Sequence, residues 1–210
     1  QPRVPITAKL VAKLLEVAGT NRILTLDLHS TQIQGFFDIQ ADNLFAAPVL
    51  LDYIKELNLR NPMIVSPDVG STKIGRAFAK RLNVDLAIVD KRRSEKDNVD
   101  VMNLIGDVRG RDVVILDDMI TTGGTLVKAA RAVQEKGATS VVACATHGVF
   151  AGDAWRLIMD SPIREVVATN SLPFDGVGEC PKVKIVDVSG LIAEAIKRIH
   201  YNESVSTLFV

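Results

Sequence analysis

The segment from residue 113 to residue 125 combines an apolar run, two carboxylates and a loop of small residues. It reads Val-Val-Ile-Leu-Asp-Asp-Met-Ile-Thr-Thr-Gly-Gly-Thr. Gly123 and Gly124 would let the backbone approach a ligand closely, beside the exposed N–H groups of a helix that begins near the end of the segment. Three hydroxyls lie in the same loop, those of Thr121, Thr122 and Thr125. The combination predicts a cradle for an anionic group.

Two adjacent acids, Asp117 and Asp118, follow the apolar run directly. A phosphate would repel them, so we expect them to accept hydrogen bonds from sugar hydroxyls or to reach a metal ion through water. The alternative is an ordinary turn with helix-capping threonines and two solvated acids. The order of strand, acid pair and Thr-Gly-Gly-Thr favours the ligand site.

This segment resembles the phosphoribosyl-diphosphate signature shared by type I phosphoribosyltransferases and ribose-phosphate diphosphokinases. The resemblance implies that the loop binds the 5-phosphate of a ribose and that the acid pair faces the 2- and 3-hydroxyls. Thr121 is a departure, because diphosphokinases usually have an Asp there and some phosphoribosyltransferases have a Thr. The loop alone therefore does not separate the two classes.

A second segment, residues 23–38, distinguishes diphosphokinases from phosphoribosyltransferases. Asp27 and His29 are two residues apart, so we expect both on the same side of a strand. A His at a strand end is often a structural hydrogen-bonding group. Asp-Leu-His followed by Gln-Ile-Gln-Gly-Phe-Phe-Asp, however, is similar to a run of the diphosphokinases that the transferases lack. The resemblance implies that His29 helps to hold the magnesium ion of MgATP.

Residues 65–75 form another junction between a strand and a helix, Val-Ser-Pro-Asp-Val-Gly-Ser-Thr-Lys-Ile-Gly. An acid before a flexible loop at a helix start could hold a metal and a phosphate together, although Asp68 as a simple helix cap is the alternative. The resemblance implies a diphosphate loop made of Asp68, Gly70, Ser71 and Thr72, with Asp68 as the second magnesium position. Ser71 replaces a glycine that the family often has.

Asp90-Lys-Arg-Arg93 opens a polar stretch, residues 91–100, that we interpret as a mobile loop. Three consecutive cations are usually a solvated patch. Cations are also what a phosphoryl-transfer site needs to stabilise the charge on the transferred group. The resemblance implies a catalytic loop in which Lys91 and Arg93 act, Arg93 also at the ribose 5-phosphate.

Apolar runs that alternate with amphipathic stretches predict the elements that position these residues. The expected strands are 23–28, 63–65, 86–89, 113–116, 141–144, 165–168 and 183–186. The expected helices are 44–56, 74–82, 125–136, 154–160 and 191–199. Alternating strands and helices predict an α/β fold, a mostly parallel sheet with helices on both faces. The resemblance makes this fold type I phosphoribosyltransferase-like.

The resemblance covers about residues 2–209, but the family's chain is longer at its amino end. It implies that residues 1–45 are the tail of an amino-terminal phosphoribosyltransferase-like domain and residues 46–210 the carboxyl-terminal catalytic domain. We therefore expect the 210-residue chain by itself to bind ribose 5-phosphate but to hold ATP weakly.

Composition excludes other classes of protein. Lys plus Arg and Asp plus Glu both number 25, so no net field favours nucleic acid or a membrane surface. No apolar run approaches the roughly 20 residues that span a bilayer, and no signal peptide is evident. Cys144 and Cys180 are too few for a disulfide framework, so we expect free thiols and a cytoplasmic protein.

The resemblance implies a ribose-phosphate diphosphokinase of nucleotide biosynthesis that uses Mg²⁺, ATP and ribose 5-phosphate and assembles as a homohexamer. A phosphoribosyltransferase is the first alternative, favoured only by Thr121. The second is a non-catalytic regulatory homologue, against which the intact Lys91, Arg93, His29 and Asp68 argue.

Overall fold

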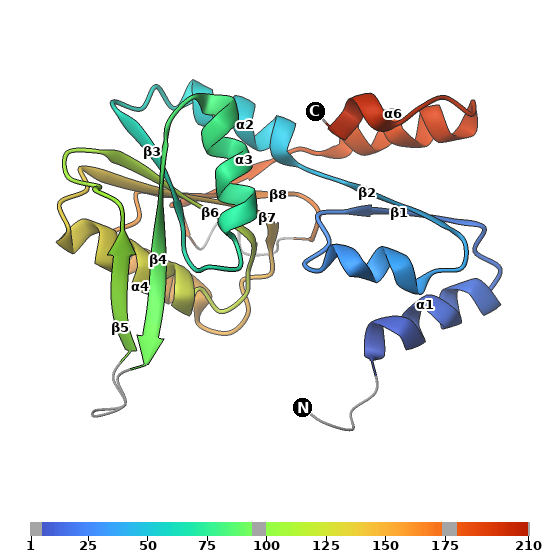
Figure 1. The fold of residues 1–210 in the computed structure, drawn as a ribbon, viewed down its shortest axis with the longest axis horizontal. Helices are drawn as coiled ribbons and strands as arrows, with labels where there is room; N and C mark the ends of the chain where they lie inside the picture. Colours follow the sequence, from blue (N-terminus) through green and yellow to red (C-terminus); the bar gives the residue numbers. More distant parts are fainter. Residues whose placement is uncertain (1–5, 94–99, 174–179, 210) are drawn as a thin grey trace.

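A seven-stranded sheet forms the centre of the computed structural model, which describes residues 6–93, 100–173 and 180–209 and no side chains at 91–93, 100–102 and 209. From one edge to the other the strands are β5 (Asp100–Ile105), β4 (Asp85–Arg93), β3 (Pro62–Ser66), β6 (Asp112–Ile120), β7 (Ser140–Gly148), β8 (Glu165–Thr169) and β9 (Val183–Val186) (Figure 1). Every neighbouring pair is parallel except β4 with β5. The predicted mostly parallel sheet is confirmed.

Helices cover both faces of this sheet, as predicted. One face packs against α2 (Ala47–Glu56), α3 (Thr72–Leu82) and α6 (Ser189–His200), and the other against α4 (Gly124–Glu135) and α5 (Ala154–Met159). The central strand β6 alternates between them: Val113 and Ile115 join the core with α4, while Val114 and Leu116 join the core with α2 and α3. A strand buried on both sides reads as a continuous apolar run, which is why the sequence shows it clearly.

Close approach of α3 to β3 depends on Gly75. A Cβ at this position would lie 2.4 Å from the Ser66 hydroxyl and 3.0 Å from Leu86 Cδ1. Only glycine therefore lets α3 lie this close to the sheet. This contact fixes the loop between Ser66 and Thr72, which carries Asp68.

A second, two-stranded parallel sheet lies beside the main one and below α6 in the view of Figure 1. Its parts are α1 (Thr7–Val17), β1 (Arg22–Leu26), the 3₁₀ helix η1 (Thr31–Phe36) and β2 (Gln40–Leu44). The sequence predicted only β1 here and wrongly began a helix at Leu44. The sequence Gln-Ala-Asp-Asn-Leu of β2 has no β-branched residue, so pairing with β1 rather than propensity makes it a strand.

The expected loop at residues 91–100 is corrected at both ends. Strand β4 continues through Arg93 and β5 begins at Asp100, and the two pair antiparallel, Arg93 with Asp100 and Lys91 with Met102. Residues 94–99 lie outside the described part of the chain. Backbone hydrogen bonds in this ladder outweigh the polar composition that predicted a loop. The other predicted strands and helices match observed elements within a few residues.

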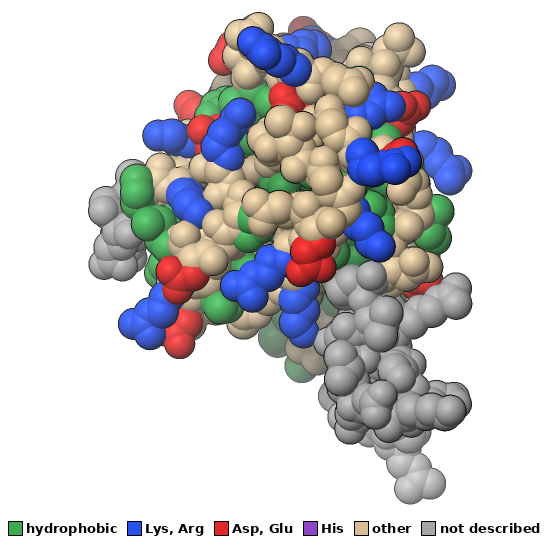
Figure 2. Space-filling model, turned by 90° about the vertical axis from the view of Figure 1, so that its left-hand side faces the viewer, with side chains coloured by type: hydrophobic (Ala, Val, Ile, Leu, Met, Phe, Trp, Pro, Cys, Tyr) green, Lys and Arg blue, Asp and Glu red, His purple; other side chains and the backbone are tan. Residues whose placement is uncertain are grey.

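One face of the surface carries side chains of both charges. Figure 2 shows Lys and Arg side chains interspersed with Asp and Glu on the face that is turned to the left in Figure 1. Within the described ranges no helix is both long and apolar enough to cross a membrane. Cys144 and Cys180 are buried free thiols, as predicted.

Tyr53 links α2 to the sheet, since its hydroxyl donates to Glu165 Oε1 on β8 at 2.8 Å. Burial and this hydrogen bond raise the pKa of Tyr53 to about 12. We expect Tyr53→Phe to lower the free energy of unfolding by about 1 kcal/mol in urea denaturation at pH 7.

The raised pKa favours the neutral phenol, so this contribution is present below the ordinary pKa of about 10 and is lost as the pH rises through about 12. Tyr201→Phe is the matched control, because Tyr201 is 64% exposed. Equal stability of the two variants would show that the Tyr53 hydrogen bond contributes nothing.

Candidate functional site

The loops that follow β3 and β6 emerge side by side at the carboxyl ends of these two central strands. From β3 the chain crosses through α3 to β4 on one side, and from β6 it crosses through α4 to β7 on the other. Ligands of open α/β sheets bind in the crevice where neighbouring crossovers diverge in this way. The Asp68 loop and the segment that contains Asp117 to Thr125 both lie at this point.

The small-residue loop has the backbone form that the sequence predicts. Gly123 adopts φ +74°, a left-handed conformation suited to glycine, and α4 begins at Gly124 without a side-chain cap. The threonines Thr121, Thr122 and Thr125 are exposed beside this helix start. First-turn N–H groups are the donors that an anion meets at a helix start, and three exposed threonines lie in the same loop.

The acid pair lies within β6 rather than after it, because the strand continues to Ile120. Asp118 N–H donates to Asp117 Oδ1 at 3.0 Å, and Met119 N–H donates to Asp118 Oδ1 at 3.0 Å. Burial raises the pKa of Asp117 to about 7, and the adjacent negative charge of Asp118 adds to the effect. A cation or a hydrogen-bond donor from a ligand would relieve this unfavourable pair of charges.

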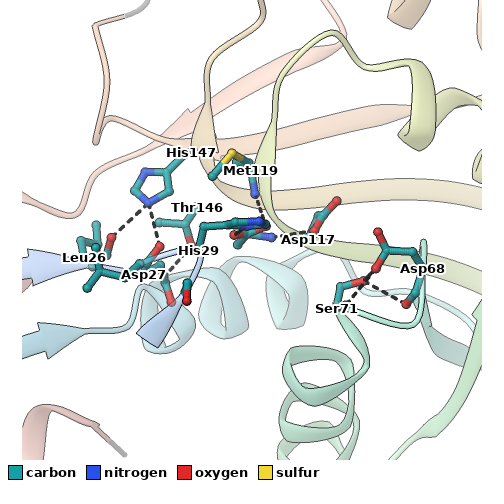
Figure 3. Close-up of polar contacts among 12 residues, drawn as sticks. Leu26, Asp27, His29, Asp68, Ser71, Asp117, Met119, Thr146 and His147 are labelled. Carbon is teal, nitrogen blue, oxygen red and sulfur yellow. Dashed lines mark hydrogen bonds and ion pairs between the residues drawn. The ribbon is translucent and has the colours of Figure 1, made fainter. Parts of the chain in front are cut away.

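His29 reaches the acid pair from the small sheet (Figure 3). Its Nδ1 lies 2.6 Å from Asp118 Oδ2, although the His29 side chain is 73% exposed. The hydrogen bond to Asp118 raises the pKa of His29. The expectation that Asp27 and His29 share one side of a strand is wrong: β1 ends at Leu26, and Asp27 turns the chain with φ 43°.

Asp68 closes a local turn with Ser71. Its Oδ1 accepts hydrogen bonds from Ser71 N–H at 2.9 Å and Ser71 Oγ at 3.1 Å, just before α3 begins at Thr72. Ser71 is the N-cap residue of α3 and no side chain caps the helix, so these contacts order the loop before α3 and do not bear out the interpretation of Asp68 as a helix cap. The negative charge of Asp68 also contributes to the raised pKa values of His29 and Asp117, so the three groups share one electrostatic environment.

A cavity of about 510 Å³ opens between the small sheet and α3. Four residues predicted for the site line it: His29, Gly70, Asp117 and Asp118. The remaining predicted residues do not: Asp68, Ser71, Thr72 and Thr121–Thr125 lie at or beside the edge of the sheet. Lys91 and Arg93 are in β4, but their side chains lie outside the described part of the structure.

The sequence analysis missed two cations of the cavity wall, Lys73 and Arg81. Both are exposed, and Ala77 between them also lines the cavity. Their spacing of four and eight residues puts all three on one face of α3, so helical periodicity could have found them. The cavity therefore has an acidic end on β6 and a cationic wall on α3.

The donor groups fit a cation that brings further ligands with it. Among the described residues no three His, Cys, Asp or Glu side chains gather closely enough to hold a metal ion by themselves. Mg²⁺ is usually bound by one or two carboxylates and completed by waters and substrate phosphates. Asp117, Asp118 and Asp68 supply carboxylates of this kind, whereas His29 Nδ1 is already engaged by Asp118.

Comparisons with known proteins give a consistent family. Residues 91–210 match the family described as phosphoribosyl synthetase-associated domain. The chain is 52% identical over 209 residues to the ribose-phosphate pyrophosphokinase of Wolinella succinogenes, covering 100% of this chain and 67% of that protein. It is also 52% identical to the ribose-phosphate pyrophosphokinase of Helicobacter pylori strain J99, covering 99% of this chain and 65% of the relative.

A solved structure shares the fold. The phosphoribosylpyrophosphate synthetase of Mycobacterium smegmatis superimposes with a TM-score of 0.88 at 38% identity, over 95% of this chain and 65% of that one. The chain thus spans about two thirds of the length of the proteins it matches.

Gly123→Val should weaken binding of ribose 5-phosphate, the ligand that the sequence predicts for this loop, by about tenfold or more. A side chain is strained at φ +74° and adds atoms where backbone N–H groups must meet the phosphate. Titration calorimetry measures the affinity. Gly110→Val is the matched control, because Gly110 has φ +67° with open space around it. Equal affinity in both variants would show that the loop does not hold the phosphate.

Proposed function

The chain belongs to the ribose-phosphate pyrophosphokinase family, and from this premise we propose that it transfers the diphosphoryl group of MgATP to the 1-hydroxyl of ribose 5-phosphate. The products are phosphoribosyl diphosphate and AMP. One observation carries the proposal: a helix start without a side-chain cap, a carboxylate pair and an imidazole lie near the point where the crossovers after β3 and β6 diverge. This arrangement supplies partners for both a sugar phosphate and a metal-bound polyphosphate.

In this proposal the sugar lies between Gly123 and the acid pair. The first-turn N–H groups of α4 and the neighbouring threonine hydroxyls bind the 5-phosphate. Asp117 and Asp118 accept hydrogen bonds from the 2- and 3-hydroxyls, which hold the ring and direct the 1-hydroxyl toward the donor. The neighbouring diphosphate loop, Asp68 to Thr72, lies at the start of α3, where a helix dipole favours negative charge.

The cavity is suited to the nucleotide donor. Its volume of about 510 Å³ is typical of small-ligand pockets, and Lys73 and Arg81 line it together with the acid pair. Cations on this wall favour polyphosphate oxygens. Mg²⁺ bound with ATP would neutralise phosphate charge during transfer. His29, Asp68 and the acid pair are the groups that would hold it, as the sequence predicts for His29 and Asp68.

Lys91 and Arg93 are proposed to stabilise the charge that develops as the 1-hydroxyl attacks the β-phosphorus in line. Such a reaction needs no covalent enzyme intermediate. The support is the resemblance of Asp90-Lys-Arg-Arg93 to the catalytic loop of the family and the position of both residues on β4, next to β3 in the sheet.

The wider organisation is part of the same proposal. Residues 1–45 would be the tail of an amino-terminal domain, supported by their separate two-stranded sheet. The exposed apolar side chains of α1 also support it: Leu10, Val11, Leu14, Leu15 and Val17. We further propose a cytoplasmic homohexamer, on the family resemblance alone.

Lys91→Ala should lower turnover by about a hundredfold or more, with the affinity for ribose 5-phosphate changed by less than about threefold. A cation matched to transition-state charge contributes little in the ground state. Initial rates and calorimetry separate the two effects. Arg92→Ala is the control from the same segment, since no role is proposed for Arg92. Near-normal turnover of Lys91→Ala would show that the Lys-Arg-Arg run is a solvated patch without a catalytic role.

The overall proposal is tested by incubating the protein with MgATP and ribose 5-phosphate and resolving the nucleotides by chromatography. AMP that forms only when ribose 5-phosphate is present, together with phosphoribosyl diphosphate, is the expected result. Release of diphosphate that depends on a nucleobase, from added phosphoribosyl diphosphate, would instead favour the phosphoribosyltransferase. If the protein lacks both activities but changes the rate of an active relative, it is the regulatory homologue.

A further inference from the structure

The turn that leads to His29 is bound by the end of β7. Thr146 Oγ1 donates to Asp27 Oδ2 at 2.6 Å, and His147 Nε2 lies 3.0 Å from the carbonyl oxygen of Leu26 and 3.2 Å from that of Asp27 (Figure 3). These contacts join residues about 120 positions apart in the sequence. Together with the contact between His29 and Asp118, they join the small sheet to the main sheet at the site.

Asp27 is held from its own sheet as well. Its N–H donates to the carbonyl of Leu44 at 2.8 Å, and its Oδ2 accepts a second hydrogen bond from Ala46 N–H at 2.8 Å. Asp27 adopts φ 43°, which is unfavourable for a residue with a side chain and persists only where surrounding contacts fix it. The same carboxylate oxygen thus meets two donors, one from β7 and one from Ala46, the N-cap residue of α2.

His147 has a defined orientation. Carbonyl oxygens only accept hydrogen bonds, so Nε2 must carry a proton and donate to Leu26 and Asp27. On the other side of the ring, Nδ1 lies 2.9 Å from the Ser171 hydroxyl, which also lies 3.2 Å from the carbonyl oxygen of Thr146. The imidazole is therefore fixed at both nitrogens while it holds the turn.

The contacts that hold the Asp27 turn and the acid pair lie on two paired strands, β7 and β6. In the register of β6 and β7, Asp117 lies opposite Ala145 and Met119 opposite His147, so Thr146 lies at the level of Asp118 and His147 one residue beyond it. His29 follows the held turn by two residues and is itself 73% exposed. An exposed side chain loses much conformational freedom when it is held in one place, and a fixed backbone reduces that loss at the moment of binding.

We propose that Asp27, Thr146 and His147 are positioning residues that hold His29 against Asp118 by fixing the backbone of the turn. The inference rests on the proposed function for its catalytic consequence, but the placement of His29 can be measured without it. In this account Asp27 acts through the geometry of its Oδ2 atom and not as a metal ligand. Asp27→Asn, which retains an oxygen acceptor, should therefore preserve the arrangement.

The test compares Thr146→Val, which removes the donor hydroxyl at nearly constant shape, with Thr146→Ser, which keeps it. Long-range ¹H–¹⁵N spectra of the imidazoles report the placement of His29, since the chain has 3 His and variants assign them. In Thr146→Val we expect the His29 ring nitrogens to shift toward their values in Asp118→Asn, the reference for a lost pair. Thr146→Ser and Asp27→Asn should retain the wild-type shifts. Unchanged His29 signals in Thr146→Val would overturn the proposal.

Steady-state kinetics test the catalytic consequence of the proposal. Thr146→Val should lower kcat by about tenfold or more, as misplacement of a binding group by a fraction of an ångström can do. The KM for ribose 5-phosphate should stay within about twofold, and Thr146→Ser should recover the rate. A loss of kcat in Asp27→Asn equal to that in Thr146→Val would instead identify Asp27 as a ligand and refute the positioning role.

The two hypotheses fail in different ways. A wild-type protein without diphosphokinase activity contradicts the proposed function, while the imidazole spectra still decide the placement of His29. If Thr146→Val does not fold, the pair His147→Leu and His147→Gln replaces it, because Gln keeps an N–H donor near the position of Nε2. The proposal is supported if the wild-type His29 ring-nitrogen shifts are lost in His147→Leu but kept in His147→Gln. The same His29 shifts in both variants contradict it.

Discussion

Parallel pairing of β3 with β6 is the constraint on which the site depends. The two strands are fixed in register, Val65 beside Ile115, and both are buried on their two faces. The two strands are parallel, so the loops that follow them emerge at the same end of the sheet. Their crossovers then run in opposite directions, so the loops diverge there. Asp68 and the acid pair come together for this reason, although 48 residues lie between Asp68 and Asp117.

Crowding of negative charge at that edge gives the site its chemistry. Asp117 has its pKa raised to about 7 by burial next to Asp118, and His29 has its pKa raised because Asp118 accepts its hydrogen bond. A buried carboxylate pair is costly without compensating donors or cations. The cations Lys73 and Arg81 face the same cavity, so an anionic ligand with a bound metal ion would balance both ends.

The small sheet contributes to this site only through contacts with the main one. Asp27, on the turn after β1, meets Thr146 from β7, and His29 reaches Asp118 on β6. An enzyme site that is built between two sheets depends on their relative placement to within a fraction of an ångström. The proposed assignment of residues 1–45 to another domain would place this junction at a domain interface, where ligand sites are common.

The sequence by itself determined the strands of the main sheet except β5, its helices, and the residue types at the carboxyl ends of β3 and β6. Strands such as Val113 to Leu116 are buried on both faces, so they are recognisable as apolar runs, and a Gly-Gly loop before a helix is a pattern that suits an anion. Sequence could not show that β2 is a strand, that β6 extends through the acids, or that Asp27 turns away from the strand axis. Each of these depends on a partner far along the chain: β1 for β2, β7 for Asp117, Thr146 for Asp27. Local propensity carries no information about such partners, so only the tertiary structure decided how His29 meets Asp118.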